Sequence, residues 1–246
     1  MRIRFLVAAL ATLATPAAAQ QSLNASSERA SIARPVVELF TSQSCSSCPP
    51  ADQVLADLAS GDDVVALSWH VDYWNNLSVG SRGRWRDPFS SAANTERQRD
   101  YNRRLRGAAR VYTPQIVVNA ATETVGSRRA AVWQLVDEAA SKLPEIGVDA
   151  RLEGREVAFD VSGAPSGLRA AIVMFKKTTR TPVGGGENAG ERLTNANVVV
   201  EMKPLGEIAG PSTFTVDAPS AENGCALILS KPNGEIFAGA YCPSAA

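Results

Sequence analysis

The sequence predicts an α/β fold in its first half, followed by a small antiparallel β-sandwich. Between residues 35 and 145, short apolar runs alternate with segments that place apolar residues at helical spacing. From about Gly147 the helical spacing largely disappears, and short apolar runs separated by Gly, Pro and Ser turns take over. Alternating strands and helices indicate a sheet covered by helices, whereas closely spaced short strands indicate a sandwich.

The composition is that of an ordinary globular protein and argues against several classes. The 246 residues include 25 Lys and Arg against 25 Asp and Glu, and 45% are apolar. This balance argues against disorder, and zero net charge argues against a dedicated nucleic-acid-binding protein. The one long apolar stretch, at the N-terminus, is too short to predict a stable membrane span.

The first 19 residues predict a secretory signal peptide. Arg2 and Arg4 form a basic head, an apolar run follows, and a small-residue cleavage site ends at Ala19. Cleavage near Ala19 would give a secreted or periplasmic protein. Residues 20–34 are rich in Ser, Ala, Gln and Asn and predict a polar linker. The four cysteines are therefore interpreted for an oxidising compartment.

Four strands and three helices are expected in residues 35–145. The strands are Val36–Phe40, Val64–Trp69, Gln115–Asn119 and Thr122–Val125, and the helices begin at Pro49, at Asn94 or Thr95, and after Ser127. Apolar residues at positions i, i+3, i+4 and i+7 mark the buried face of the first helix. Residues 75–93 form a polar insertion that would cover or gate a site.

Residues 147–246 are expected to form the β-sandwich. The expected strands are Val148–Leu152, Glu156–Val161, Leu168–Phe175, Thr213–Val216, Cys225–Ser230 and Glu235–Tyr241, with one short helix near Thr194–Met202. The Gly184-Gly185-Gly186 cluster lacks the spacing of a nucleotide-binding turn and predicts a mobile hairpin loop.

Cys225 and Cys242 flank a predicted hairpin. If Asn233-Gly234 is a two-residue turn, the two cysteines face each other at a non-hydrogen-bonded pair, where side chains come closest. A type I turn with Pro232 at its first corner would shift the register by one and place Tyr241 opposite Cys225. A structural disulfide is favoured, because two neighbouring thiols in an exported protein rarely stay reduced.

Cys45-Ser46-Ser47-Cys48 lies between a strand and a helix, where α/β folds build their sites. A helix N-terminus stabilises a thiolate, and two cysteines at this spacing close a small, reducible ring. This arrangement permits thiol–disulfide exchange. Because Pro49 and Pro50 cannot sit deep in a helix, the helix is expected to begin near Cys48.

The strand, CxxC and helix resemble a thioredoxin fold, and longer runs resemble a narrower group. The segment Glu38–Asp52, with its Cys-Ser-Ser-Cys-Pro-Pro-Ala-Asp motif, is similar to a family of secreted thioredoxin-like proteins of unknown function. The segments Trp69–Trp74 and Val111–Gln115 carry the same similarity, which covers most of the mature chain and includes the region Gly186-Glu187-Asn188. The resemblance implies a thioredoxin-like domain over residues 35–145, with a cis proline at Thr113-Pro114 that faces the cysteines and shapes the substrate groove.

Two further residues are candidates for the site. Glu38 would be the buried acid that moves a proton to the resolving cysteine, as a strand carboxylate does in thioredoxins, or a solvent-facing strand residue. His70, the only histidine, would stabilise the Cys45 thiolate, join Cys45 and Cys48 as a copper or zinc ligand, or be a hydrogen-bonded structural residue.

A run of nine arginines and three acids extends from Arg82 to Arg110. A solvated helix face is the favoured interpretation, and docking of an acidic partner is the alternative.

Three functions are weighed. The preferred one is an exported thiol–disulfide oxidoreductase or redox partner that acts on protein thiols and disulfides without a cofactor, with Cys45 attacking and Cys48 resolving. The alternatives are a copper- or zinc-handling protein and a non-enzymatic binding module whose disulfides are structural.

Overall fold

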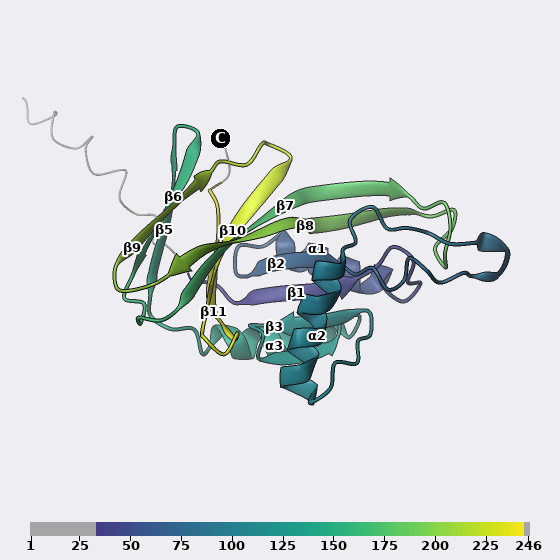
Figure 1. Cartoon of the computed structure of the whole chain (residues 1–246), viewed down its shortest axis with the longest axis horizontal. Helices are drawn as coiled ribbons and strands as arrows, with labels where there is room; N and C mark the ends of the chain where they lie inside the picture. Colours follow the sequence, from purple (N-terminus) through teal and green to yellow (C-terminus); the bar gives the residue numbers. More distant parts are fainter. Residues whose placement is uncertain (1–32, 244–246) are drawn as a thin grey trace, which may run out of the picture. The chain divides into compact units, whose positions relative to one another are not determined.

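The protein is built around a sheet of eight strands and a smaller sheet of three strands (Figure 1). The computed structural model describes residues 33–243. The predicted signal peptide, and all but the last two residues of the predicted linker, lie outside this range. None of the helices within it has the length and apolar character needed to cross a bilayer.

The elements of the first half follow the order expected from the sequence. They are β1 (Val36–Thr41), α1 (Pro49–Ala59), β2 (Val65–His70), the 3₁₀ turn η1 (Gly80–Arg82), α2 (Ala92–Arg106), β3 (Gln115–Val118), β4 (Thr122–Val125) and α3 (Arg129–Ala140). The predicted cap of α2 at Asn94 or Thr95 is wrong. Ser91 caps the helix, because its side chain accepts the Asn94 amide, and the left-handed Gly107 ends it.

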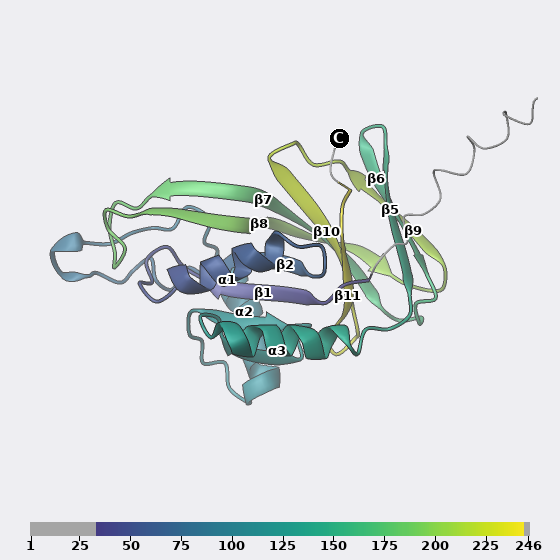
Figure 2. The same ribbon diagram turned by 180° about the vertical axis from the view of Figure 1, so that it is seen from behind.

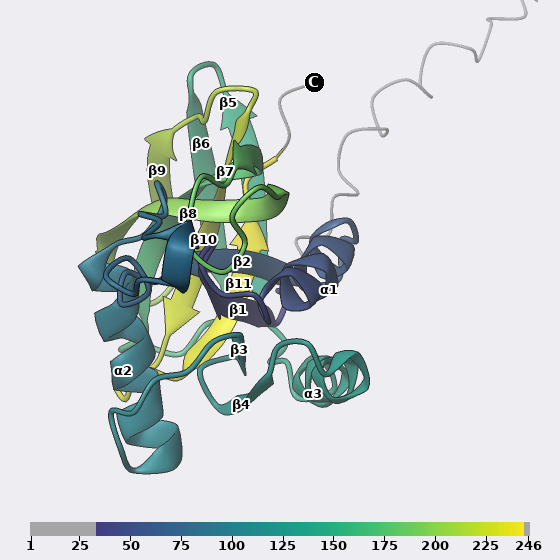
Figure 3. The same cartoon turned by 90° about the vertical axis from the view of Figure 1, so that its right-hand side faces the viewer.

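Strand β1 lies at the centre of this half. It is parallel to β2 and antiparallel to β3, which pairs with β4. Val37 and Leu39 pack against α1 and α3, whereas Val36 and Phe40 face the side covered by α2. Figures 2 and 3 show α1 and α3 on one side of these strands and α2 on the other. The result is a three-layer α/β arrangement.

The second half is almost entirely strands. They are β5 (Gly147–Glu153), β6 (Glu156–Ser162), β7 (Arg169–Pro182), β8 (Arg192–Glu207), β9 (Ser212–Asp217), β10 (Asn223–Ser230) and β11 (Ile236–Tyr241). Strands β7, β8, β10 and β11 extend the large sheet, whose order is β11-β10-β7-β8-β2-β1-β3-β4. Strands β5, β6 and β9 form the small sheet, which shares a hydrophobic core with β7 and β10. The division at residue 146 into two domains stays a prediction.

The helix expected near Thr194–Met202 is wrong. These residues lie inside β8, which pairs along almost its whole length with β7. The run Val198-Val199-Val200 explains the outcome, because β-branched side chains favour the pleated strand over the helix.

Only one residue pair of the sheet ladder joins β8 to β2, namely Val198 and Ser68. Side chains complete the seam. The Asn197 amide donates to the Ala66 carbonyl and to the Tyr241 hydroxyl, each at 3.0 Å. The Ala66 N–H donates to that hydroxyl at 2.7 Å. Polar side chains from β8 and β11 thus satisfy the backbone groups of Ala66 on the edge of β2 that β8 pairs only at Ser68.

Cys225 and Cys242 form the predicted disulfide, with Cα atoms 5.2 Å apart. The register at the cysteines is the one that the two-residue turn predicted, since Ala226 pairs with Tyr241. The turn itself is the alternative one, with Gly234 left-handed, and a bulge beyond Leu229 restores the register. The predicted non-hydrogen-bonded position is wrong, because the Cys242 N–H donates to the Cys225 carbonyl at 2.8 Å.

Candidate active site

Cys45 and Cys48 are joined in a disulfide between the end of β1 and the start of α1. Their Cα atoms are 5.4 Å apart, and the Cys48 N–H donates to the Cys45 carbonyl at 3.1 Å. Cys48 is the N-cap residue of α1, and Pro49 and Pro50 fill its first two positions. Proline is tolerated there because these backbone positions need no helical donor. The predicted start of the helix is confirmed.

Both cysteines are completely buried, although Ser46 and Ser47 between them are exposed. A partner thiol therefore cannot reach either sulfur in this state. The predicted insertion, residues 75–93, supplies one part of the cover. The Ser44 hydroxyl donates to the Trp85 carbonyl at 3.1 Å, and the Gln43 N–H donates to the Asp87 carboxylate at 2.8 Å.

The second part of the cover is the segment between β7 and β8, residues 183–191, called here the strap. The Asn188 amide donates to the Gln43 carbonyl at 3.0 Å and to the Cys45 carbonyl at 2.9 Å. The Glu187 carboxylate accepts the Ser46 N–H at 2.8 Å and the Ser46 hydroxyl at 2.7 Å. The strap is thus hydrogen-bonded to the backbone of the CxxC loop itself.

The glycine cluster of the strap serves close packing. A Cβ on Gly185 would lie 2.3 Å from the Arg84 carbonyl oxygen, which is closer than van der Waals contact allows. Gly186 has a φ of +71°, and its Cβ would lie 3.2 Å from that of Ser44. The cluster, interpreted from the sequence as a mobile hairpin loop, is packed against the insertion and the CxxC loop.

A group of buried polar side chains lies at the carboxyl ends of β1 and β2, on the face covered by α1. The Thr41 hydroxyl donates to the Asp52 carboxylate at 2.9 Å. His70 Nδ1 lies 2.6 Å from Asp87 Oδ2, and both side chains are fully buried. His70 Nε2 has no hydrogen-bond partner among the described residues. His70 is therefore tied to the insertion, and this pair bridges β2 to the cover.

The pKa values of the two acids in this group, Asp52 and Asp87, are shifted in opposite directions. Burial raises the pKa of Asp52 to about 6, although the nearby His70 and the Thr41 hydrogen bond oppose the rise. Burial also raises the pKa of Asp87, but the His70 charge and the hydrogen bonds to Asp87 outweigh that effect and leave its pKa below the ordinary value. Asp52 lies four residues after Cys48, in the first turn of α1, so it is the buried acid on the side of the cysteines.

The raised pKa of Asp52 predicts a pH dependence of stability. The folded protein holds this proton more tightly than the unfolded chain, since about 6 exceeds the ordinary 3.8. The stabilising contribution is fully present below pH 3.8 and is lost as the pH rises through 6. We expect Asp52→Asn to remove this loss, on the order of 2 kcal/mol, in urea unfolding between pH 4 and pH 7. Asp137→Asn, which removes an exposed carboxyl on α3, should keep the wild-type profile.

Glu38 is buried, so the solvent-facing alternative is wrong, but it lies on the other face of β1. It shares that face with Val36 and Phe40, which pack toward α2. Its carboxylate accepts Arg97 Nε at 2.8 Å and the Tyr101 hydroxyl. The structure does not bring Glu38 together with the cysteines, which lie on the α1 side.

The Thr113-Pro114 peptide bond is cis, as the resemblance implied. Phe40 pairs with Gln115, so Pro114 comes next to Thr41 at the end of β1 from which the CxxC loop begins. The Thr113 hydroxyl accepts the Trp74 indole N–H at 2.8 Å. The proline loop and the CxxC loop therefore lie at the same end of the sheet.

The alternative metal site is not assembled in this state. The two sulfurs are bonded to each other, and His70 Nδ1 is engaged by Asp87. Within residues 33–243, no group of three or more His, Cys, Asp or Glu side chains is arranged to hold a metal ion.

A family model described as protein of unknown function (DUF1223) matches residues 36–229. This chain belongs to that family. The DUF1223 match includes the CxxC loop, the insertion and the strap, and it ends before Cys242. No curated protein matches the chain.

Two solved structures extend the comparison of this DUF1223 protein. Protein AGR_C_4864 from Agrobacterium tumefaciens is 30% identical, with a TM-score of 0.72 over 86% of this chain and 94% of that chain. HBP35 of Porphyromonas gingivalis is 14% identical, with a TM-score of 0.53 over 86% of this chain and 75% of that chain. The second likeness shows the fold alone.

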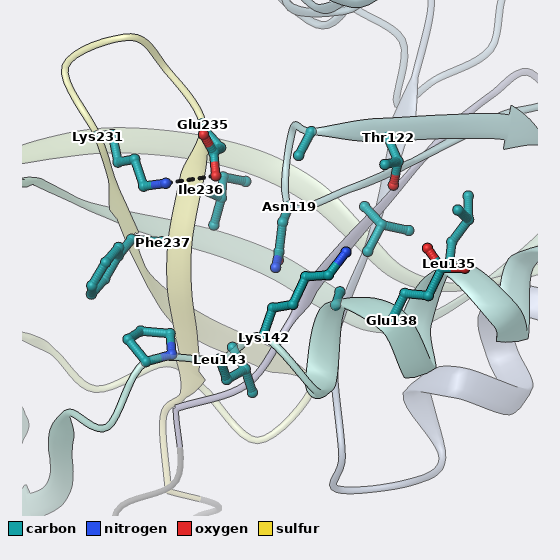
Figure 4. Close-up of a pocket in the computed structure, with 14 residues that line it drawn as sticks. Asn119, Thr122, Leu135, Glu138, Lys142, Leu143, Lys231, Glu235, Ile236 and Phe237 are labelled. Carbon is teal, nitrogen blue, oxygen red and sulfur yellow. Dashed lines mark hydrogen bonds and ion pairs between the residues drawn. The ribbon is translucent and has the colours of Figure 1, made fainter.

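A pocket of about 180 Å³ lies away from the cysteines of the DUF1223 chain (Figure 4). It lies among the end of α3, the turn between β3 and β4, and the turn between β10 and β11, and Lys231 pairs with Glu235 at its rim at 2.7 Å. None of the predicted site residues lines it.

Several residues of the site were not found from the sequence. They are Gln43, Asp52, Asp87, Glu187 and Asn188. Asp52 carried a usable signal, since an acid four residues after a cysteine in a first helical turn shares its face. Gln43 adjoins the CxxC loop but carries no distinguishing pattern. Asp87, Glu187 and Asn188 reach this loop from segments far away in the sequence, so no local pattern shows their contacts with it.

Proposed function

We propose that this protein is an exported thiol–disulfide oxidoreductase, or the redox partner of one, that works through Cys45 and Cys48. The observation that carries the proposal is the Cys45–Cys48 disulfide at the start of α1, at the same end of the sheet as the cis Thr113-Pro114 bond. A ring of this size at a helix N-terminus is suited to reversible exchange. Two disulfides and the basic and apolar N-terminus support export.

Residues 35–145 are, in this proposal, a thioredoxin-like unit. The strand order β2-β1-β3-β4, with α1 and α3 on one face and α2 on the other, supports it. Residues 147–246 are the adjoining β-rich part, and they supply the strap.

The exchange reaction of the reduced form proceeds in two steps. The Cys45 thiolate attacks one sulfur of a partner disulfide, so that a mixed disulfide forms and the partner's other sulfur leaves as a thiolate. The Cys48 thiolate then attacks Cys45 Sγ, which re-forms the Cys45–Cys48 bond and releases the second partner thiolate. Two electrons pass to the partner, and the reverse sequence oxidises it. Asp52, in place of Glu38, would accept the Cys48 proton.

The test is a redox titration of the protein from residue 20 onward in glutathione buffers, with thiols trapped at each potential. We expect Cys45–Cys48 to equilibrate between roughly −120 and −270 mV, the range of dithiol catalysts. A pair that resists reduction below about −300 mV would instead be structural, and the binding-module hypothesis would replace this one. A parallel titration with Cu(I) addresses the metal-handling alternative.

Single variants assign the two sulfurs. Cys48→Ser should accumulate a mixed disulfide with a disulfide-bonded model substrate such as scrambled lysozyme, because the Cys45 thiolate opens a substrate disulfide and the resolving thiol is missing, whereas Cys45→Ser should form none. Removal of Cys225 and Cys242 is the matched control and should leave the titration unchanged. Equal trapping by both single variants would contradict the assigned roles.

A further inference from the structure

We propose that the surface formed by the insertion and the strap over the Cys45–Cys48 disulfide is a docking surface for an acidic segment of a partner protein. In the unbound protein, Glu187 occupies the position that a carboxylate of that segment would take. This inference rests on the proposed function, because it names the class of partner that the site would take.

The first observation is the way in which Glu187 is held. Its carboxylate accepts two hydrogen bonds from one residue, Ser46, which lies between the two cysteines. Among the described residues, no Lys, Arg or His side chain lies within salt-bridge distance of this carboxylate. Both bonds are exposed to solvent, where such contacts are weak. A carboxylate from another molecule can therefore compete for the same two donors.

The second observation is independent and concerns the insertion. The side chains of residues 84–87 point alternately toward the buried site and toward solvent. The Trp85 indole donates to the Gln43 side chain, and Asp87 binds His70, so these two point inward. Arg84 and Arg86 are exposed on the outer side, and Arg82 is exposed nearby. Within the described residues, none of these three guanidinium groups has an acidic partner.

The two observations meet at one place. Arg82 donates to the Glu187 carbonyl at 3.0 Å, and the Arg84 carbonyl packs against Gly185. Acids of the same segments are few, namely the buried Asp87, the half-buried Glu187 and the exposed Glu191. The arginines of α2 differ, since Arg99 and Arg103 are paired with Glu96. Among the described residues, Arg104 and Arg110 of the basic run also lack an acidic partner, and the three arginines of the insertion are the ones that adjoin the strap.

An acidic segment fits this surface. Its side-chain carboxylates would pair with the three arginines, and one of them would replace Glu187 on the Ser46 N–H and hydroxyl. Loss of the Glu187 contact would loosen the strap from the CxxC loop, so docking and exposure of the disulfide would be linked.

The experiment measures binding to the oxidised protein, without any exchange reaction. The probe is a fluorescein-labelled, capped hexaglutamate peptide, followed by anisotropy at low ionic strength. We expect the triple variant Arg82→Gln/Arg84→Gln/Arg86→Gln to bind it about tenfold more weakly, a factor consistent with three exposed ion pairs. Glu187→Ala should bind it a few-fold more tightly, because the internal competitor is gone.

Two control variants keep the result interpretable. The triple lysine variant Arg82→Lys/Arg84→Lys/Arg86→Lys keeps the charge and should bind within about threefold of the wild type. Arg155→Gln/Arg169→Gln removes two exposed arginines that have no acidic partner among residues 33–243. Arg169 begins β7, the strand that ends at Pro182 before the strap, and Arg155 lies in the turn between β5 and β6, so this double variant should leave binding unchanged.

Three outcomes would overturn the inference. They are absence of hexaglutamate binding, equal weakening by the distal pair, and binding of phosphatidylglycerol vesicles in place of the peptide. Because the protein stays oxidised throughout, these outcomes leave the redox proposal standing. If the disulfide resists reduction in the titration but the peptide still binds, the redox proposal alone is refuted.

Discussion

Replacing Arg97 with Met is expected to destabilise the protein by about 3–5 kcal/mol, the usual cost of breaking a buried ion pair. Glu38 is completely buried, and Arg97 Nε is its charged partner at 2.8 Å. The guanidinium also lies over the rings of Trp69, at 4.7 Å, and Tyr101, at 5.0 Å. Without it, the carboxylate would keep only the Tyr101 hydroxyl and would lose its charge compensation.

Urea unfolding at pH 7 measures this loss. Arg99→Met is the matched control, since Arg99 lies two residues away on α2 and makes only a surface pair with Glu96. The double variant Glu38→Leu/Arg97→Met should recover much of the stability, because no unpaired charge remains. Similar losses for Arg97→Met and Arg99→Met would show that Glu38 finds other compensation.

Removing the second disulfide, by Cys225→Ala with Cys242→Ala, is expected to cost about 3 kcal/mol. The two cysteines are 17 residues apart in sequence, and cross-linking a loop of that length restricts the unfolded chain considerably. The bond also holds the end of the chain after β11 against β10.

Thermal unfolding in the oxidised state gives the measurement. Cys45→Ala with Cys48→Ala is the control, because a separation of three residues restricts the unfolded chain less. The first pair should therefore lower the melting temperature more and leave the glutathione titration intact. The reverse order of losses would assign the structural role to Cys45–Cys48.

Local signals predicted most of the individual elements. The apolar spacing in residues 51–58 located α1, and Pro49 and Pro50 fixed its start. Gly107 marked the end of α2 through its left-handed backbone. In β8 the apolar residues follow neither the helical spacing nor the two-residue alternation of a strand. Register shifts interrupt the pairing of β8 with β7, which breaks the alternation. That irregularity is why the sequence predicts a helix near Thr194–Met202.

The arrangement of the site was only half predictable. The CxxC loop and the proline loop belong to one strand-and-helix pattern, so the resemblance anticipated both. The sequence predicts Glu38 as the buried acid because it matches the strand carboxylate of thioredoxins, and strand alternation alone does not tell which face of β1 it takes. The insertion is predicted as a cover or gate, but the role of the strap is not, since Asn188 and Cys45 are 143 residues apart.

The long separation between the strap and the cysteines has a consequence for how the protein folds. Contacts between residues far apart in sequence form late, because closing the intervening loop costs entropy before any contact repays it. The strap reaches the CxxC loop from the tip of the β7–β8 hairpin, across separations of 141 to 145 residues. In a newly made chain, Cys45 and Cys48 would therefore be open to oxidants before the hairpin docks. The order of folding would ensure that the pair is sealed as a disulfide.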